Sequence, residues 1–256
     1  MITRRPLSRT FAGALDPRNY LLLWRMAMRY TNFFGSLYRF VSGRGSYPYV
    51  FGIRTPRGLV TLTAKSYHDL LTVNEVFCRE DYRTDDRIGT AVDIGANIGA
   101  SALYFLTRND RCRVWLFEPD PRNIPRLREH LRGYEDRYEL SEHAVADFTG
   151  PASFGLERSG RYGGIGKHPD NAITVESLDI NDVLASIPGT IDVLKIDTEG
   201  LEIRIVQAID RQHLERIRTI YFDADYQDPG VIHPDLFDQR IRFDVCRLAN
   251  RSNDRK

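Results

Sequence analysis

The sequence has few cysteines, no long apolar segment and no excess of charge of either sign. Its three cysteines, Cys78, Cys112 and Cys246, form no CxxC pair, which argues against a disulfide scaffold or a zinc site and indicates a reduced, cytoplasmic compartment. The most apolar stretch, residues 20–41, contains three arginines and so fails the requirement of about 20 apolar residues for a membrane span. Lys and Arg total 36 against 35 Asp and Glu, so no global field favours nucleic acid as a partner.

Positive charge is nevertheless concentrated near the N-terminus. Residues 1–45 contain eight arginines and one acidic residue, Asp16, and the pattern predicts a basic, aromatic-rich helical arm over residues 1–46. Two interpretations of this arm stay open. It lies at the anionic inner surface of a membrane, or it packs over the active site or at a homodimer interface with its apolar side inward and its arginines in water. We favour the packed arm.

Two further zones follow the arm. Residues 47–89 predict a β-hairpin over 49–64 and then an amphipathic helix over 68–80. From residue 90 to 256, short β runs alternate with helical runs, interrupted by a glycine-rich stretch at 150–179 that predicts a β excursion over the sheet edge. The alternation predicts an α/β fold with a Rossmann-like, mainly parallel sheet and helices on both faces.

The stretch AVDIGANIGASALYFL, residues 91–106, has the pattern of a strand, a glycine turn and a helix N-terminus. In an open α/β sheet such a turn lies at the carboxyl edge, where ligands bind. The GxGxxG pattern of dinucleotide sites is absent, since only Gly95 and Gly99 are present, and Asp93 precedes the first glycine by two residues. A carboxylate at that point repels a pyrophosphate and suits a ligand with an ammonium group.

A second carboxylate, Glu118, ends the next predicted strand in VWLFEPDP. An acid at this position can accept hydrogen bonds from both ribose hydroxyls, as it does in NAD sites. Together with Asp93 and the missing third glycine, it favours S-adenosylmethionine as the cofactor. The alternative is that Asp93 caps the turn and Glu118 pairs with a nearby arginine such as Arg122.

Five ordered motifs, VDIGANIGASAL, FEPDP, HAVAD, TVESLD and IDVLKIDTEGLE, resemble those of the FkbM-type methyltransferases, which are class I S-adenosylmethionine enzymes. The resemblance covers roughly residues 50–225. It implies a cofactor site made of Asp93, Gly95, Asn97 and Gly99 around the methionine part, Glu118 at the ribose, and Ala144, Val145 and Asp147 at the adenine. From the residues alone, a turn-forming role for Asp147 is an equal alternative.

Methyl transfer needs an acceptor oxygen in line with the sulfonium and a group that takes its proton. In LKIDTEGLE, Asp197 ends a predicted strand, Glu199 follows it, and Lys195 alternates with Asp197 on the same side of the strand. We predict these three as the catalytic group, with Lys195 either steering the substrate or keeping a carboxylate ionised. The alternative is that Asp197 or Thr198 caps the next helix and Glu199 lies in its first turn.

The resemblance implies O-methylation of a hydroxyl, commonly on a sugar, a glycolipid or a secondary metabolite, so the expected partner is a small-molecule or glycan acceptor. Asp197, Asp223 and Asp225 have the oxygen ligands that Mg²⁺ takes, but we favour a solvated acidic rim without metal. Two rival functions stay open. One is an NAD(P)-linked oxidoreductase, disfavoured by the missing GxGxxG, and the other is a non-enzymatic membrane-surface adaptor that uses the basic arm.

Overall fold

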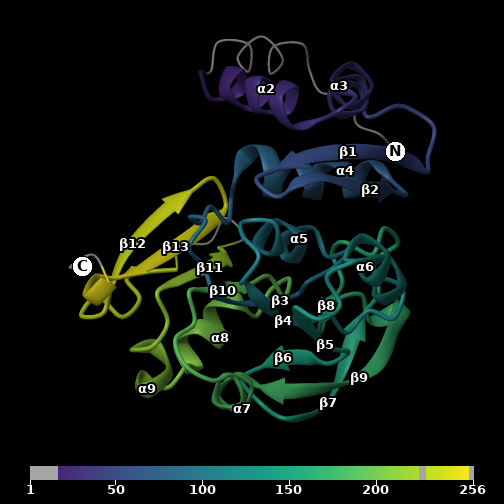
Figure 1. Ribbon diagram of the computed structural model, residues 1–256. Helices are drawn as coiled ribbons and strands as arrows, with labels where there is room; N and C mark the ends of the chain where they lie inside the picture. The colour runs from purple at the N-terminus through teal and green to yellow at the C-terminus, as the bar shows by residue number, and fades with distance from the viewer. Residues whose placement is uncertain (1–16, 225–228, 254–256) are drawn as a thin grey trace. The chain divides into compact units, whose positions relative to one another are not determined.

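The computed structural model describes residues 17–224 and 229–253 of the chain. It contains two compact units, Met1–Glu80 and Asp81–Lys256 (Figure 1). The three-zone division with boundaries at 46 and 89 stays a prediction beside this two-unit division. Within the described ranges, no helix is both long enough and apolar enough to cross a membrane.

The first unit combines helices with a two-stranded hairpin. The predicted hairpin is confirmed, and its register runs from Tyr49 opposite Ala64 to Thr55 opposite Gly58. The described part of the arm forms two helices, and the Asn32 side chain caps the second by accepting the Gly35 N–H. The elements of this unit are α2 (Pro17–Arg29), α3 (Phe33–Ser42), β1 (Tyr49–Thr55), β2 (Gly58–Ala64), α4 (Tyr67–Asn74) and the π-helix η1 (Glu75–Arg79).

The second unit contains the predicted α/β sheet, with seven strands in the order β12-β13-β11-β10-β3-β4-β5. The five strands from β11 to β5 are parallel. At one edge β13 pairs antiparallel with β11, and β12 pairs antiparallel with β13. The strands are β3 (Thr90–Ile94), β4 (Arg113–Phe117), β5 (Tyr138–Ser141), β10 (Val193–Ile196), β11 (Thr219–Asp223), β12 (Phe237–Arg242) and β13 (Val245–Asn250).

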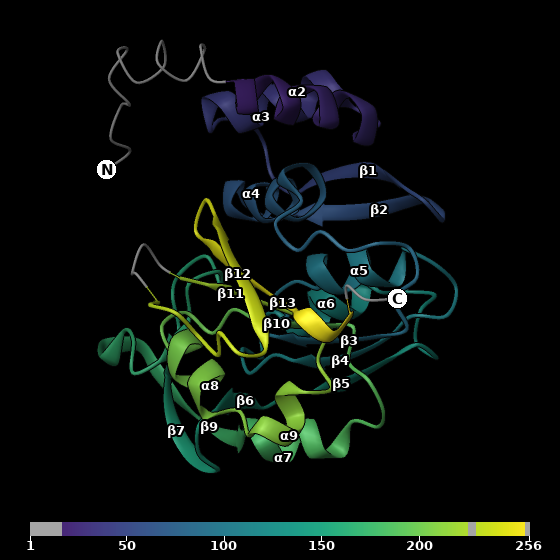
Figure 2. The same ribbon diagram turned by 90° about the vertical axis from the view of Figure 1, so that its left-hand side faces the viewer.

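Helices cover both faces of this sheet, as Figures 1 and 2 show. One face carries α5 (Ala100–Leu106) and α6 (Ile124–His130), and the other carries α7 (Ile180–Ser186), α8 (Glu202–Ala208) and α9 (Arg211–Leu214). Fully buried aliphatic side chains from β3, β10 and β11 pack against α7 and α8 to form the main core. Because both faces are buried, these strands are mostly apolar, and the charged Asp93 and Lys195 within them pair with each other.

A second, four-stranded sheet accounts for the glycine-rich stretch. It has the order β6-β9-β7-β8 and consists of β6 (Ala144–Ala146), β7 (Gly150–Gly155), β8 (Gly164–Ile165) and β9 (Ala172–Asp179). The β run over residues 138–145 forms two strands, because the chain breaks after Ser141 and β6 joins the second sheet. The break places Ala144 and Val145 where the two sheets meet.

Candidate functional site

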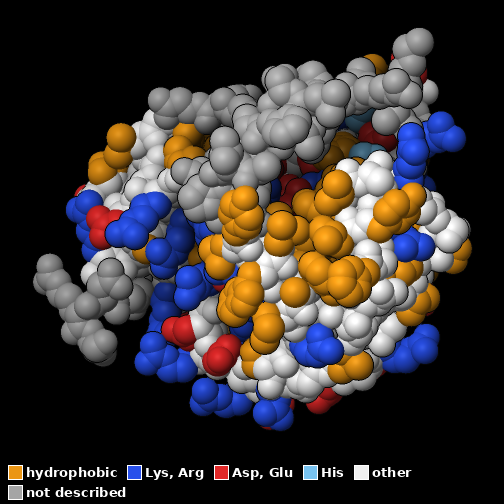
Figure 3. Space-filling model, turned by 90° about the horizontal axis from the view of Figure 1, so that it is seen from above, with side chains coloured by type: hydrophobic (Ala, Val, Ile, Leu, Met, Phe, Trp, Pro, Cys, Tyr) orange, Lys and Arg blue, Asp and Glu red, His pale blue; other side chains and the backbone are white. Residues whose placement is uncertain are grey.

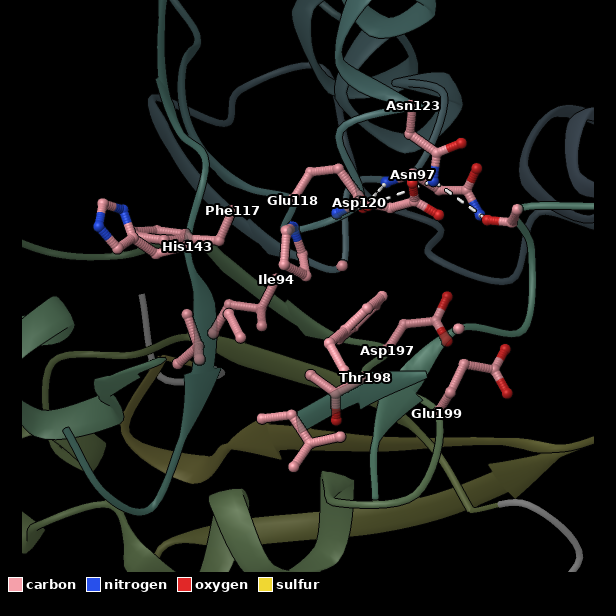
Figure 4. Close-up of a pocket in the computed structure, with 18 of the residues that line it drawn as sticks. Ile94, Asn97, Phe117, Glu118, Asp120, Asn123, His143, Asp197, Thr198 and Glu199 are labelled. Atoms are coloured by element: carbon pink, nitrogen blue, oxygen red, sulfur yellow. Dashed lines mark hydrogen bonds between the residues drawn. The ribbon is translucent and has the colours of Figure 1, made fainter. Parts of the chain in front are cut away.

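A pocket of about 540 Å³, including its open mouth, lies at the carboxyl ends of β3, β4 and β10 (Figure 4). The strand register explains why. Ile94 pairs with both Phe117 and Ile196, so these three neighbouring strands end at the same level. The next residue on each strand is Gly95, Glu118 or Asp197, and all three line the pocket. This is the edge at which open α/β sheets bind ligands.

The glycine turn needs glycine at Gly95 for a steric reason. Its φ is +76°, and a Cβ there would lie 1.8 Å from the carbonyl oxygen of Asp197, so no side chain fits. Its N–H also donates to the Phe117 carbonyl, which ties the turn to β4. Asn97, at φ +50°, lines the pocket, whereas Gly99 does not and instead packs against Leu127.

Glu118 is a buried carboxylate of the pocket, with 4% of the residue exposed. The backbone N–H groups of Asn97 and Asp120 donate to it at 2.7 and 2.9 Å, and the Asn123 amide donates at 3.2 Å (Figure 4). Burial raises its pKa to about 7 in spite of these bonds. The alternative pairing with Arg122 is wrong, because that guanidinium binds Asp120 instead, at 2.6 Å.

Asp93 and Lys195 lie beneath the pocket and do not line it. Asp93 is fully buried, 3.0 Å from Lys195 Nζ, and accepts the Ser101 hydroxyl at 2.5 Å. Lys195 also donates to the Gly95 carbonyl at 2.6 Å and is 3.4 Å from Asp197. Burial lowers the pKa of Lys195, but the two carboxylates outweigh it and raise the pKa to about 12. Because Lys195 is buried and bound to both carboxylates and to the Gly95 carbonyl, its geometry fits the support of carboxylate charge better than the steering of a substrate.

Asp197 and Glu199 face the pocket from the loop after β10. The Tyr82 hydroxyl donates to Asp197 at 3.3 Å. Glu199 has the left-handed φ of +60° and lies 3.3 Å from Lys167 Nζ. Burial, with the nearby Asp197 charge, raises the Glu199 pKa to about 7, although Lys167 acts in the opposite direction. Both carboxylates are therefore within the pocket and differ in their electrostatic surroundings.

Glu202, for which the sequence predicted no role, binds the loop that the capping alternative concerns. Glu202, buried at the start of α8, accepts the N–H groups of Thr198 and Gly200 at 2.8 Å. It thus ties the loop before α8 to the first residue of the helix, and no side chain of Asp197, Thr198 or Glu199 caps the helix. A glutamate in a first helical turn is the sequence signal that could have identified this residue.

Loop 156–163 borders the pocket on the side of the second sheet, a role that no sequence pattern indicates. The Asn123 amide donates to the Gly160 carbonyl at 3.0 Å, and Arg122 donates to the Glu157 carbonyl at 2.9 Å. Gly160, Arg161 and Gly163 from this loop line the pocket. Because these bonds join residues more than 30 positions apart, no local pattern could have revealed them.

Two other predicted groups lie elsewhere. Asp147 is outside the pocket lining and forms a two-bond ion pair with Arg204, at 2.9 and 2.7 Å. Of the three carboxylates considered for Mg²⁺, Asp225 falls outside the described residues, and Asp223 does not line the pocket. Across the described part of the chain, no cluster of three His, Cys, Asp or Glu side chains could hold a metal ion.

The chain is similar to known methyltransferases. Residues 93–241 match the family described as the methyltransferase FkbM domain. The 2-O-methyltransferase NoeI of Sinorhizobium fredii is 30% identical over 156 residues, which cover 54% of this chain and 63% of that protein. The methyltransferase sdnD of Sordaria araneosa is 24% identical over 233 residues, covering 70% of this chain and 85% of that protein. A crystal structure of a methyltransferase from Geobacter sulfurreducens matches with a TM-score of 0.41 and 15% identity, covering 70% of this chain and 78% of that chain.

Proposed function

The chain belongs to the FkbM methyltransferase family, and we propose that it transfers the methyl group of S-adenosylmethionine to a hydroxyl oxygen. The observation that carries this proposal is the pocket in which Glu118 faces the Asp197–Glu199 pair (Figure 4). The matched part of the chain spans less than two thirds of NoeI, whose name gives an oxygen as the methylated atom. We propose that this chain also methylates an oxygen, and that the acceptor is a hydroxyl of a sugar, glycolipid or secondary metabolite.

The pocket residues fit S-adenosylmethionine in charge and shape. Glu118 has acceptor capacity left on its Oε2 oxygen, which takes one protein N–H, and can bind the ribose hydroxyls. Ala144 and Val145 offer a small apolar surface for the adenine ring. The cofactor site we propose also includes Gly95 and Asn97.

When bound, S-adenosylmethionine supplies an electrophilic methyl group on a sulfonium. In this proposal Glu199 accepts the proton of the acceptor hydroxyl. A base acts best when its pKa is close to the working pH, and burial and the Asp197 charge raise the pKa of Glu199 to about 7. Asp197 contributes the neighbouring negative charge and is positioned by Tyr82 and Lys195. In this proposal Asp93 and Lys195 act from beneath, by fixing the glycine turn and Asp197.

The same geometry disfavours the rival functions. A dinucleotide would bring a pyrophosphate to a pocket lined by Glu118, Asp197 and Glu199, where the carboxylates oppose its charge. A purely non-enzymatic adaptor leaves the raised pKa values of two pocket carboxylates without a use. The free, buried cysteines support the cytoplasm as the compartment that we propose.

Transfer of labelled methyl groups tests this function. The purified chain is incubated with methyl-labelled S-adenosylmethionine and a panel of sugar, glycolipid and small phenolic or alcohol acceptors. Replacing Glu118 with alanine is expected to weaken cofactor binding by about 1.5–3 kcal/mol, which appears as a raised KM for the cofactor. Glu139→Ala, which removes an exposed carboxylate from the neighbouring strand β5, is the matched control. An unchanged KM for Glu118→Ala would remove that residue from the site.

A further inference from the structure

The outer face of α2 and α3 exposes a group of large apolar side chains in the first unit. Seen from the side of these two helices, hydrophobic side chains gather over them (Figure 3). Trp24 is 61% exposed and Phe34 is 81% exposed. The apolar face, as defined here, consists of Tyr20, Leu21, Trp24, Met28, Phe34, Tyr38 and Val41.

The spacing of these residues is helical, and the arginines of the same segment point the other way. Positions 20, 24 and 28 on α2, and 34, 38 and 41 on α3, follow the three- and four-residue steps of one helix face. Arg25 and Arg29 instead bind Glu80 at 3.0 and 2.8 Å, on the inner side of the unit. The segment is apolar on both sides, since Met26 and Tyr30 are buried within the unit while the apolar face is exposed.

The exposed charge of the first unit is of one sign. Its described acids are withdrawn from the surface: Asp69 caps α4, Glu75 lies near Arg79, and Glu80 binds two arginines. Among the described residues of this unit, the charged side chains classed as exposed are all basic, namely Arg44, Arg54, Arg57 and Lys65. Arg54 donates to the backbone carbonyl of Met28, which places this positive charge next to the apolar face.

We propose that the apolar face is a docking surface for an anionic lipid bilayer. Aromatic and aliphatic side chains on one helix face enter the boundary between headgroups and acyl chains, while basic residues attract anionic lipids. Tryptophan and tyrosine suit that boundary because each carries a polar group on an apolar ring. The first unit thus has the two signals, apolar insertion and positive charge, that peripheral attachment requires.

A second copy of the chain fits the face less well. In a two-fold dimer the same surface meets itself, so Arg44 and Arg54 would face a surface on which every exposed charge among the described residues is also positive. Like charges at an interface oppose association, whereas an anionic bilayer gains from the same charges. Charge complementarity therefore selects the lipid surface as the occupant.

Trp24 is a built-in reporter for this contact, because the chain has only one other tryptophan, Trp115. In the full chain carrying Trp115→Phe, vesicles of phosphatidylcholine with phosphatidylserine are expected to shift the Trp24 emission to shorter wavelength. Brominated acyl chains in the same vesicles are expected to quench it. Co-sedimentation of the unmodified chain with these vesicles gives a second measurement that does not depend on how well Trp115→Phe folds.

Substitutions separate the two signals. Joint replacement of Trp24 and Phe34 by serine is expected to lower vesicle partitioning about tenfold or more, and Arg44→Ala to lower it about fivefold for anionic vesicles only. Ile241→Ser, an exposed apolar residue of β12 in the second unit, is the matched control and is expected to leave partitioning unchanged.

Three results would overturn the proposal. One is a full chain that stays in the supernatant with anionic vesicles at low salt. Another is equal partitioning into neutral and anionic vesicles. The last is a Trp24 emission shift that follows protein concentration without lipid, together with a dimer in sedimentation velocity, because a second copy would then cover the face.

Discussion

Replacing Lys167 with methionine tests whether Glu199 accepts the proton in the proposed reaction. The Lys167 ammonium lies 3.3 Å from a Glu199 carboxylate oxygen and favours its ionised form. Methionine keeps the apolar stem of the side chain and removes the charge. The pKa of Glu199, raised to about 7 by burial and by Asp197 while Lys167 opposes the rise, is therefore expected to increase further.

The size of the increase follows from Coulomb's law. Two unit charges at this distance interact by about 1.3 kcal/mol at the dielectric constant of water, and more strongly where they are half-buried. One pKa unit corresponds to about 1.4 kcal/mol, so the Glu199 pKa should rise by about one unit or more. A base acts only when deprotonated, so its active fraction at pH 7 falls from about one half to about one tenth. We expect kcat to fall about fivefold at pH 7 and to recover by about pH 9.

The assay is single-turnover methyl transfer between about pH 6 and pH 9, which reports the chemical step without product release. Arg204→Met is the matched control, since it removes an exposed cation from an ion pair with Asp147 outside the pocket. Its profile is expected to match that of the unmodified chain. The assignment of Glu199 as the proton acceptor is refuted if the pH profile of Lys167→Met also matches that of the unmodified chain, and if Glu199→Gln keeps the rise of rate with pH.

Three further predictions concern the pocket and its support. As the pH falls from 8 to 6, Glu118 becomes protonated around its pKa of about 7, so affinity for S-adenosylhomocysteine should fall about tenfold; calorimetry of Glu118→Gln should show no such trend. Gly95→Ala should lower the melting temperature far more than Gly133→Ala. Both glycines have positive φ, but only at Gly95 would a Cβ lie 1.8 Å from a backbone oxygen. Equal losses would contradict the steric need for glycine at position 95. Asp93→Asn should cost about 3–5 kcal/mol in urea unfolding because it removes one partner of a buried ion pair with Lys195, and a cost below about 1 kcal/mol would show that the pair contributes little.

The frame of the site was predictable because it depends on local pattern. Alternating β and helical runs locate the strand ends at Gly95, Glu118 and Asp197, and parallel pairing brings such ends to one edge. The register of Ile94 with Phe117 and Ile196 then brings them to one level. Nothing beyond strand positions and the usual rules of α/β sheets was needed to place these three residues together.

The sequence did not predict how deeply each side chain is buried or which distant residues it contacts. Alternation put Lys195 and Asp197 on one side of a strand but could not show that Lys195 lies below the pocket, paired with Asp93. The sequence placed apolar residues around the arm but could not show which of them are exposed. That depends on Glu80, about 50 positions away from Arg25 and Arg29. Such contacts are decided by tertiary packing, so they become visible only in the folded chain.

The central claim is that the pocket at these strand ends takes S-adenosylmethionine and not a dinucleotide. Titration calorimetry of the full chain with S-adenosylhomocysteine and, separately, with NAD⁺ tests it most directly. We predict micromolar binding of S-adenosylhomocysteine, about 8 kcal/mol in free energy, and no measurable binding of NAD⁺. Micromolar binding of NAD⁺ with no heat from S-adenosylhomocysteine would contradict the account.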